Sequence, residues 1–398
     1  MTFEELKALD HQYTMQTYGR FDVALDHGQG ATLYDLEGQS YTDFASGIGV
    51  ASLGYGHPKW IAAVEAQVHK LAHASNLFYT EPYARLAQQL CERTGMSCAF
   101  FANGGGEANE GIIKLARKYS YDKYGLGRSN IVTLHNSFHG RTITTLNATG
   151  QDVFHRFFFP FTEGFRYAEA NDLDSVERAA GIDTCAVLLE LVQGEGGVLP
   201  MDKAFVTALA DWCRERDILL LVDEVQTGVG RTGSLFCFQQ YGILPDAVTF
   251  AKGIAGGLPM AGVLAGERCR NVLTPGTHAT TFGGNPIAAA AALAVLEELD
   301  DDFLARVNEK GAYLRERIAA FQSPLVEEVR GLGLMVGIVL KEGVDRAALV
   351  KEIYDRHVLV LTAGPRTIRL LPPLVITKEE MDAGLSVLEG VLCKEEAK

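Results

Sequence analysis

Short runs of apolar residues alternate with helical segments over the middle of this chain, and this alternation constrains the fold more than any other feature. Helical patterns over Glu107–Tyr119 and Lys203–Arg216 lie between apolar runs. Segments that alternate in this way form βαβ units, so the sequence predicts an α/β fold with a mainly parallel sheet. The runs expected to be buried strands are Cys98–Ala102, Ile131–Leu134, Ala186–Leu189, Ile218–Val222 and Ala247–Phe250.

The pattern changes near residue 295. Asn285-Pro286 is typical of an N-cap followed by proline at the first helical position, and it predicts a helix to about Glu298. An amphipathic helix is expected over Phe303–Phe321. A hairpin is expected nearer the start of the chain, and a separate sheet after the amphipathic helix. These segments are Thr32–Phe44 for the hairpin, and Val326–Leu340 and Val358–Leu371 for the sheet.

A chain of 398 residues exceeds the size at which a single core usually stops growing. We therefore predict three parts. An N-terminal segment over residues 1–55 packs with the small domain, a large domain covers residues 56–295, and a C-terminal small domain covers residues 296–398.

The net charge of −14 at pH 7 limits the partners of the chain. An acidic protein gains nothing from a phosphate backbone or an anionic lipid surface, so we expect neither nucleic acid nor membrane as a partner. Seven cysteines without a CxxC pair fit free thiols in a reducing compartment, and no metal site is expected. The first residues lack an apolar signal region, and the apolar stretch Ile287–Leu296 is too short to span a bilayer. We expect a cytoplasmic protein.

Two charged residues stand at the ends of predicted strands, Asp223 after Ile218–Val222 and Lys252 after Ala247–Phe250. Ligands of open α/β sheets bind at those ends, where a carboxylate needs a partner to stay charged. A protonated pyridine nitrogen would be such a partner, although Asp223 could instead cap a helix or begin a loop. A desolvated Lys252 would have a lowered pKa and could attack an aldehyde and move a proton, although a lysine beside glycine is usually a surface residue.

The segment FFANGGGEANEG places three glycines after a strand and immediately before a helix. Glycine lets the backbone approach a phosphate, and a helix N-terminus offers free N–H groups, although a tight strand–helix connection leaves the same pattern. Arg141 in SFHGRT and Arg369 in TIRLLPPL are candidates for carboxylate binding, because a guanidinium binds both oxygens. The alternatives are a surface position for Arg141 and an internal salt bridge for Arg369.

Together these motifs resemble those of the class III aminotransferases (subgroup II), which are pyridoxal-phosphate (PLP) enzymes of fold type I. The similarity runs from about Tyr18 to Leu388. The resemblance implies a large domain with a mainly parallel seven-stranded sheet, a smaller α+β domain, and pyridoxal 5′-phosphate as cofactor. In family order, the shared motifs are NGGGEANE, FHGRT, QGEGGV, DEVQTGVGRTG, the AKG lysine, TTFGGNP and RLLPPL.

The resemblance also implies roles for single residues. Lys252 would be the Schiff-base lysine, and Asp223 would pair with the pyridine nitrogen. Thr281 would reach the phosphate of the neighbouring subunit, which implies a homodimer with shared active sites. The other cofactor contacts would come from Phe138 and Val225 on the ring faces, Gln226 at the ring hydroxyl, and Gly105 and Gly106 at the phosphate.

For the substrates, the resemblance implies that Arg141 and Arg369 bind carboxylates, with Glu195 pairing with Arg369 when glutamate is absent. Within the family, the chain length and the segment AGPRTIRLLPPL are similar to those of the enzymes that act on N-acetylornithine in arginine biosynthesis. The implied ping-pong reaction moves the δ-amino group of N2-acetyl-L-ornithine to 2-oxoglutarate, giving N-acetylglutamate 5-semialdehyde and glutamate.

The sequence departs from the family pattern at four positions. Gly104 stands where serine is usual, and Gly106 where threonine or alanine is usual. Leu191 replaces a proline, and Ala279 replaces a serine or threonine. No core catalytic group is lost, so the two glycines bear mainly on cofactor affinity and on the rigidity of the phosphate loop.

Other activities stay open at this point. Ornithine enzymes tend to carry a tyrosine where this chain has Ile48, which argues against free ornithine and makes Ile48 a candidate substrate contact. N-Succinylornithine and 4-aminobutyrate are alternative donors, and an aminomutase or decarboxylase on the same fold is less favoured. A non-catalytic binding protein is the alternative from another class, but such a protein would be free to lose Lys252 or Asp223.

Overall fold

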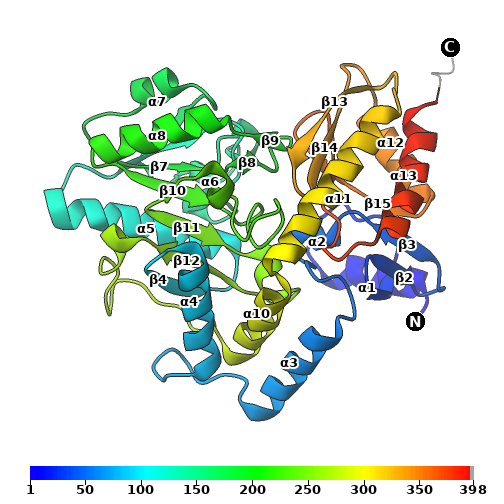
Figure 1. Cartoon of the computed structure of the whole chain (residues 1–398), viewed down its shortest axis with the longest axis horizontal. Helices are drawn as coiled ribbons and strands as arrows, with labels where there is room; N and C mark the ends of the chain where they lie inside the picture. Colours follow the sequence, from blue (N-terminus) through cyan, green and yellow to red (C-terminus); the bar gives the residue numbers. More distant parts are fainter. Residues whose placement is uncertain (395–398) are drawn as a thin grey trace.

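The computed structural model describes residues 1–394, and its largest element is a seven-stranded sheet (Figure 1). Its strands are β4 (Cys98–Ala102), β5 (Asn130–Leu134), β6 (Phe165–Ala168), β7 (Thr184–Leu189), β10 (Leu219–Asp223), β11 (Ala247–Phe250) and β12 (Ala261–Ala265). They follow the order β4-β12-β11-β10-β7-β5-β6. Only β12 runs antiparallel to its neighbours, so the predicted mainly parallel sheet is confirmed.

Both faces of this sheet are buried, because side chains alternate between the faces along each strand. On β10, Leu219 and Leu221 pack in the cluster that contains Ile112 of helix α5 (Gly105–Tyr124). Leu220 and Val222 pack instead in the cluster that contains residues of α4 (Glu81–Thr94) and α8 (Lys203–Glu215). A sheet covered on both sides explains why its central strands read as continuous apolar runs.

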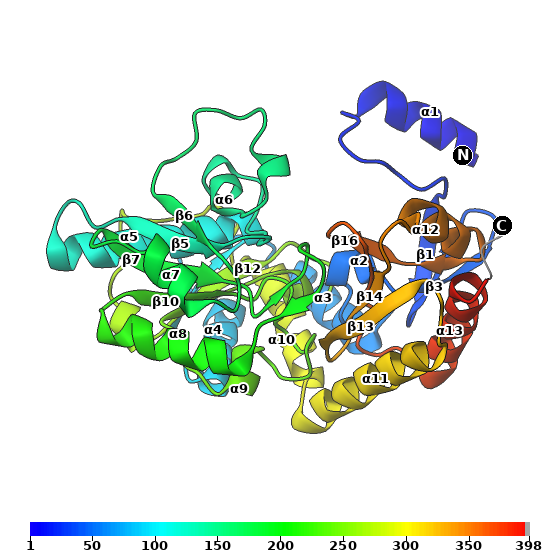
Figure 2. The same ribbon diagram turned by 90° about the horizontal axis from the view of Figure 1, so that it is seen from above.

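The predicted helix after Asn285 is present as α10 (Pro286–Glu298), and the Asn285 side chain accepts a hydrogen bond from the Ala288 N–H at 3.0 Å. The predicted amphipathic helix is α11 (Asp301–Ala320). None of the helices within residues 1–394 has the length and apolar character needed to cross a bilayer. Apart from the short left-handed turn α2 (Ser46–Gly49), the other α-helices are α1 (Phe3–Tyr13), which stands apart in Figure 2, α3 (Pro58–Lys70), α6 (Ile143–Ala148), α7 (Leu173–Ala179), α9 (Phe238–Tyr241), α12 (Arg346–Asp355) and α13 (Lys378–Leu392).

Two four-stranded sheets lie beside the large one. The first joins β1 (Leu25–Gln29), β2 (Thr32–Asp35) and β3 (Ser40–Asp43) to β15 (Val358–Leu359), so the predicted hairpin pairs with a C-terminal strand. The second has the order β13-β14-β17-β16, with strands Val326–Leu332, Met335–Leu340, Thr367–Leu370 and Leu361–Ala363. A short ribbon pairs β8 (Val192–Gln193) with β9 (Leu199–Pro200). The division at residues 55 and 295 stays a prediction, and residue 295 lies inside α10.

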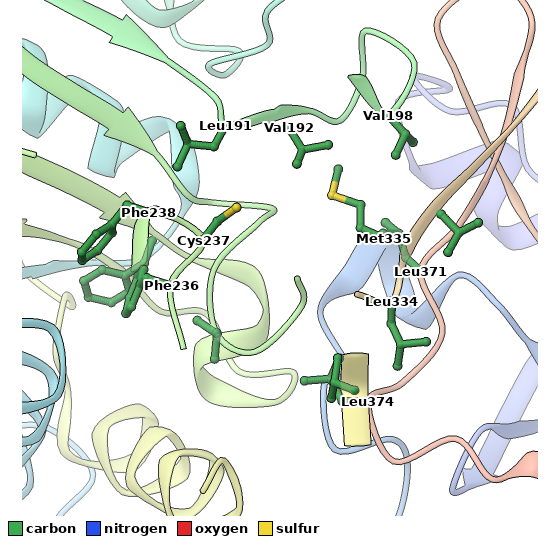
Figure 3. Close-up of a cluster of buried hydrophobic side chains, with 14 of the residues drawn as sticks. Leu191, Val192, Val198, Phe236, Cys237, Phe238, Leu334, Met335, Leu371 and Leu374 are labelled. Carbon is green, nitrogen blue, oxygen red and sulfur yellow. The ribbon is translucent and has the colours of Figure 1, made fainter. Parts of the chain in front are cut away.

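An apolar cluster connects the large sheet to the second small sheet (Figure 3). Leu191 and Phe236 come from loops beside the large sheet, and Met335 and Leu371 come from the small sheet and the segment after it. Next to this cluster the buried Arg231 donates hydrogen bonds to the carbonyls of Leu334 at 3.0 Å and Pro372 at 2.6 Å. These contacts tie the turn between β13 and β14 and the segment after β17 to the loop that follows β10.

Candidate active site

A cavity of about 810 Å³ lies at the carboxyl ends of the parallel strands. Asp223 is the last residue of β10, and Lys252 follows the end of β11 by two positions. Because β10 and β11 are parallel neighbours, their ends bring the two side chains to the same edge of the sheet. Eight predicted site residues line the cavity: Gly105, Gly106, Phe138, Arg141, Asp223, Val225, Gln226 and Lys252.

The Asp223 carboxylate is 3% exposed and is held by four hydrogen-bond contacts. Its Oδ2 accepts from Asn109 Nδ2 at 2.7 Å and lies 2.8 Å from His139 Nδ1. Its Oδ1 accepts from the Val225 N–H at 3.0 Å and from Thr249 Oγ1 at 3.3 Å. These contacts fix the direction of the carboxylate oxygens, so the site offers a preorganised carboxylate to a cation in the cavity.

Lys252 sits in a strained backbone position at the cavity. Its φ is 45°, in the left-handed region that residues other than glycine and asparagine rarely adopt. It begins the 3₁₀ turn Lys252–Ala255 directly after the extended Ala251. Burial lowers the pKa of its amine, and the positive charge of Arg369 lowers that pKa further. A lysine with a lowered pKa in an enclosed site is suited to nucleophilic attack and proton transfer.

The glycine-rich segment forms the first turn of α5, which begins at Gly105, two residues before the predicted start at Glu107. Gly104 is the N-cap and contributes no side-chain cap, so the backbone N–H groups of the first turn face the cavity without a capping side chain. A Cβ on Gly105 would lie 2.8 Å from Val225 Cγ1. Only glycine therefore lets this turn pack against Val225, and the turn can accept an anion such as a phosphate.

The two arginines differ in their surroundings. Arg369 in β17 is buried, its Nη1 donates to Glu195 Oε1 at 2.7 Å and to Gln226 Oε1 at 3.0 Å, and its Nε has no hydrogen-bond partner within residues 1–394. The internal salt bridge that was the alternative to carboxylate binding by Arg369 is therefore present, and its partner is the predicted Glu195. Arg141 is exposed, and its guanidinium lies over the rings of Phe138 and Phe154. Both arginines have donors left to bind a carboxylate.

Four predicted residues lie outside the cavity lining: Arg369 and Glu195, which pair beside it, and Ile48 and Thr281. Ile48 is 46% exposed and belongs to the left-handed turn labelled α2 (Ser46–Gly49), two positions before Val50, which does line the cavity. Its φ of 66° is unusual for a β-branched residue, and such strain is concentrated at functional sites. Thr281 is exposed in the loop before α10. The structure of one chain therefore leaves the roles of Ile48 and Thr281 as predictions.

Sequence reasoning missed three buried polar residues of the cavity, Asn109, His139 and Glu190. Burial raises the pKa of Glu190 to about 7, while its oxygens accept from the backbone N–H groups of Phe138 at 2.8 Å and Gly194 at 3.1 Å. Both Asn109 and His139 stand inside motifs that had been singled out, NGGGEANE and FHGRT. The sequence could have indicated them, because a polar side chain at a buried position needs a hydrogen-bond partner and therefore points to a polar site.

Comparison with known proteins identifies the family. The family model described as aminotransferase class-III matches residues 13–392. The chain belongs to the class III aminotransferases. It is 52% identical to the acetylornithine aminotransferase of Haemophilus ducreyi over 98% of this chain and 99% of that protein. It is 44% identical to the acetylornithine aminotransferase of Caldanaerobacter subterraneus over 96% of this chain and 98% of that protein.

Solved structures of this aminotransferase family have the same fold. An ornithine aminotransferase of Toxoplasma gondii superposes with a TM-score of 0.94 at 31% identity, covering 98% of this chain and 95% of that one. An acetylornithine aminotransferase of Elizabethkingia anophelis superposes with a TM-score of 0.87 at 30% identity, covering 98% and 99%. These matches confirm PLP fold type I, and the cofactor of the family is pyridoxal 5′-phosphate.

The cavity fits this cofactor. The cradle at Gly105, which a Cβ would fill, and the uncapped first turn of α5 suit a phosphate. The buried Asp223 carboxylate suits a protonated ring nitrogen, and the apolar side chains of Phe138 and Val225 suit the faces of an aromatic ring. Lys252 could bind its aldehyde.

Proposed function

We propose that this chain is an aminotransferase of arginine biosynthesis that moves the δ-amino group of N2-acetyl-L-ornithine to 2-oxoglutarate. The observation that carries the proposal is the set of acetylornithine aminotransferases, 42–52% identical to this chain over nearly its whole length. Lys252, Asp223 and Arg141 line one cavity, and Arg369 donates to the cavity residue Gln226. This arrangement supports the same chemistry, because it provides an amine, a buried anion and two carboxylate receptors.

In this proposal each cavity residue has one task toward the cofactor. Asp223 would keep the proton on the ring nitrogen, and Gln226 would hold the ring hydroxyl. The bound cofactor supplies an electron sink for the carbon that bears the transferred amino group. Lys252 Nζ would take a proton from that carbon and deliver it to C4′ of the cofactor. Phe138 and Val225 would contact the two ring faces, and the N–H groups of Gly105 and Gly106 would bind the phosphate.

The pair of Arg369 and Glu195 explains how one site accepts two different substrates. N-Acetylornithine has one carboxylate, which Arg141 binds, so Arg369 keeps Glu195 as its partner. 2-Oxoglutarate and glutamate have a second carboxylate, which displaces Glu195 and takes both arms of the guanidinium. Glu195 is 30% exposed while Arg369 is 3% exposed, so the carboxylate is the partner that can swing away at lower cost.

A substrate panel tests the proposal. The donors N-acetylornithine, N-succinylornithine, ornithine and 4-aminobutyrate are compared by kcat/KM with 2-oxoglutarate as acceptor. N-Acetylornithine is expected to have the highest value. If ornithine or 4-aminobutyrate ranks first, the chain has another activity within the class III family. If no donor reacts and no cofactor absorbance is seen, the chain is a non-catalytic protein of this fold.

A homodimer with shared active sites is part of this proposal. Leu77, Phe78 and Phe282 expose 86%, 69% and 61% of their surface, respectively. Their two segments touch, because Asn76 Nδ2 donates to the Gly283 carbonyl at 3.0 Å. An exposed apolar patch beside Thr281 supports a subunit interface there, with Thr281 reaching the partner's phosphate. The mass in solution checks the dimer, and a monomeric holoenzyme of full activity would contradict it.

Ile48→Tyr is expected to raise the kcat/KM ratio of ornithine to N-acetylornithine. A phenol hydroxyl offers a hydrogen bond to the free α-amino or carboxylate group, which isoleucine cannot supply, and the ring takes room needed by the acetyl group. At a φ of 66° tyrosine is no more strained than the β-branched isoleucine. An unchanged ratio would mean that Ile48 does not contact the substrate.

Gly104→Ser with Gly106→Ala is expected to slow PLP loss on dialysis and to raise the melting temperature of the holoenzyme more than that of the apoenzyme. A serine hydroxyl on the phosphate contributes roughly 1.5–3 kcal/mol, and each glycine removed reduces the ordering cost by up to about 1 kcal/mol. Neither Gly104 nor Gly106 has a positive φ, and a Cβ meets no atom within 4 Å at Gly104 and only Thr142 Cγ2 at 3.5 Å at Gly106.

Gly105→Ala is the matched contrast for this double variant. Its Cβ would lie 2.8 Å from Val225 Cγ1, so Val225 must move and PLP retention is expected to fall. Unchanged or weaker retention in the double variant would mean that the phosphate is held elsewhere.

A further inference from the structure

A second cavity, of about 380 Å³, is lined by Phe154, on whose ring the Arg141 guanidinium packs. The Arg141 guanidinium lies 4.2 Å from the centre of the Phe154 ring and 5.6 Å from the centre of the Phe138 ring. Phe154 lines the second cavity, whereas Phe138 lines the main one. Glu195, which pairs with Arg369, also lines the second cavity. Arg141 therefore connects the two spaces.

The walls of this second cavity are polar but almost uncharged. Of the described residues that line it, only Glu195 carries a charge, and that charge is paired with Arg369 at 2.7 Å. Gln151 donates through its Nε2 to the Ser137 carbonyl at 2.9 Å, which leaves its Oε1 toward other donors. Asn136 contributes an exposed amide, while Val153 and Phe154 contribute apolar surface. Such walls suit a small neutral amide.

We propose that this cavity receives the N2-acyl group of the amino donor, an inference that rests on the proposed function. The acylamido group and the carboxylate of such a donor are bonded to the same carbon. A carboxylate on Arg141 therefore directs the acyl group past Phe154 into the second cavity. There Asn136 Nδ2 donates to the acyl carbonyl, Gln151 Oε1 accepts from the amide N–H, and Val153 contacts the methyl group.

The same walls select among acyl groups. The free α-ammonium of ornithine meets no unpaired carboxylate there, because Glu195 is held by Arg369. The terminal carboxylate of a succinyl group meets no lysine, arginine or histidine among the described lining residues. An acetyl group presents no charge that needs a partner, so N-acetyl donors are favoured over both alternatives.

Binding of unreactive analogues to the PLP-loaded enzyme tests this inference without turnover. N-Acetyl-L-norvaline, N-succinyl-L-norvaline and L-norvaline lack the δ-amino group, and their affinities are measured by titration calorimetry. The acetyl compound is expected to bind tightest. Asn136→Asp keeps a residue that tolerates the φ of 64° at this position but removes the N–H donor. It is expected to weaken N-acetyl-L-norvaline about tenfold, the size of one lost hydrogen bond, and not to weaken L-norvaline, because the new carboxylate faces the free α-ammonium of that compound.

Two further variants complete the test. Val153→Lys places a cation on a side chain that is 53% exposed and is expected to raise the affinity for N-succinyl-L-norvaline relative to the acetyl compound. Asn171→Asp is the control, because Asn171 has a similar φ of 62° but lines neither cavity, and it is expected to change no affinity. If Asn136→Asp weakens all three compounds equally, or leaves the acetyl compound unchanged, the acyl group binds elsewhere. That result alongside turnover of N-acetylornithine overturns this inference alone, whereas absence of that turnover overturns the proposed function.

Discussion

Lys252→Ala is expected to reduce transamination by at least about 10⁴-fold, to the limit of detection. The variant loses both the amine that binds the cofactor covalently and the base that moves the proton, and proton transfer alone contributes about 10²–10⁴-fold. Asp223, the first turn of α5 and the ring-face residues remain, so noncovalent PLP binding should persist. The measurements are kcat for N-acetylornithine and the absorbance of the lysine-bound cofactor, which should disappear while bound PLP is still recovered after gel filtration.

The control for this variant is Lys310→Ala. Lys310 is a second lysine whose pKa is lowered by burial. It lies on α11 and does not line the cavity, and its Nζ donates to the Leu374 carbonyl at 2.9 Å. It is expected to keep the cofactor absorbance and kcat. Substantial transamination by Lys252→Ala would remove Lys252 from the mechanism, and another amine of the cavity would have to be sought.

Asp223→Asn is expected to lower kcat by about 10²–10³-fold, the usual effect of removing one preorganised charge partner. The carboxamide has no negative charge to keep a proton on the ring nitrogen. Its NH₂ group must also face a donor in either orientation, because Asn109 Nδ2 donates to Oδ2 and the Val225 N–H donates to Oδ1. A donor facing a donor in a buried site adds a cost of about 1–3 kcal/mol, so PLP retention should fall as well.

Glu224→Gln is the control for Asp223→Asn. It shows how much activity is lost when a buried carboxylate outside the cavity is neutralised. Glu224 is the next residue and is fully buried, and it accepts from the backbone N–H groups of Cys237 at 2.6 Å and Phe238 at 2.7 Å. It does not line the cavity. Its variant is expected to melt at a lower temperature while keeping kcat. If Asp223→Asn retains kcat within about tenfold while Glu224→Gln does not, the assignment of Asp223 to the ring nitrogen is wrong.

The sequence by itself determined the elements whose signals are local. Apolar runs of strand length predicted five strands of the large sheet, each within two residues of its observed ends, because both faces of that sheet are buried. Asn285-Pro286 predicted the start of α10, because a helix cap depends on adjacent residues. The sequence also placed Asp223 and Lys252 at the ends of two parallel strands, since a residue after a buried parallel strand must emerge at the carboxyl edge of the sheet.

Only the tertiary structure decided which side chains meet across long stretches of chain. Asp223 takes its donors from Asn109 and His139, which are 114 and 84 residues away. The antiparallel β12 was not predicted, because its short alanine- and glycine-containing segment has no distinctive pattern. Periodicity and capping encode how a segment is buried, whereas the partner of a buried charge is set when separate segments pack into one core.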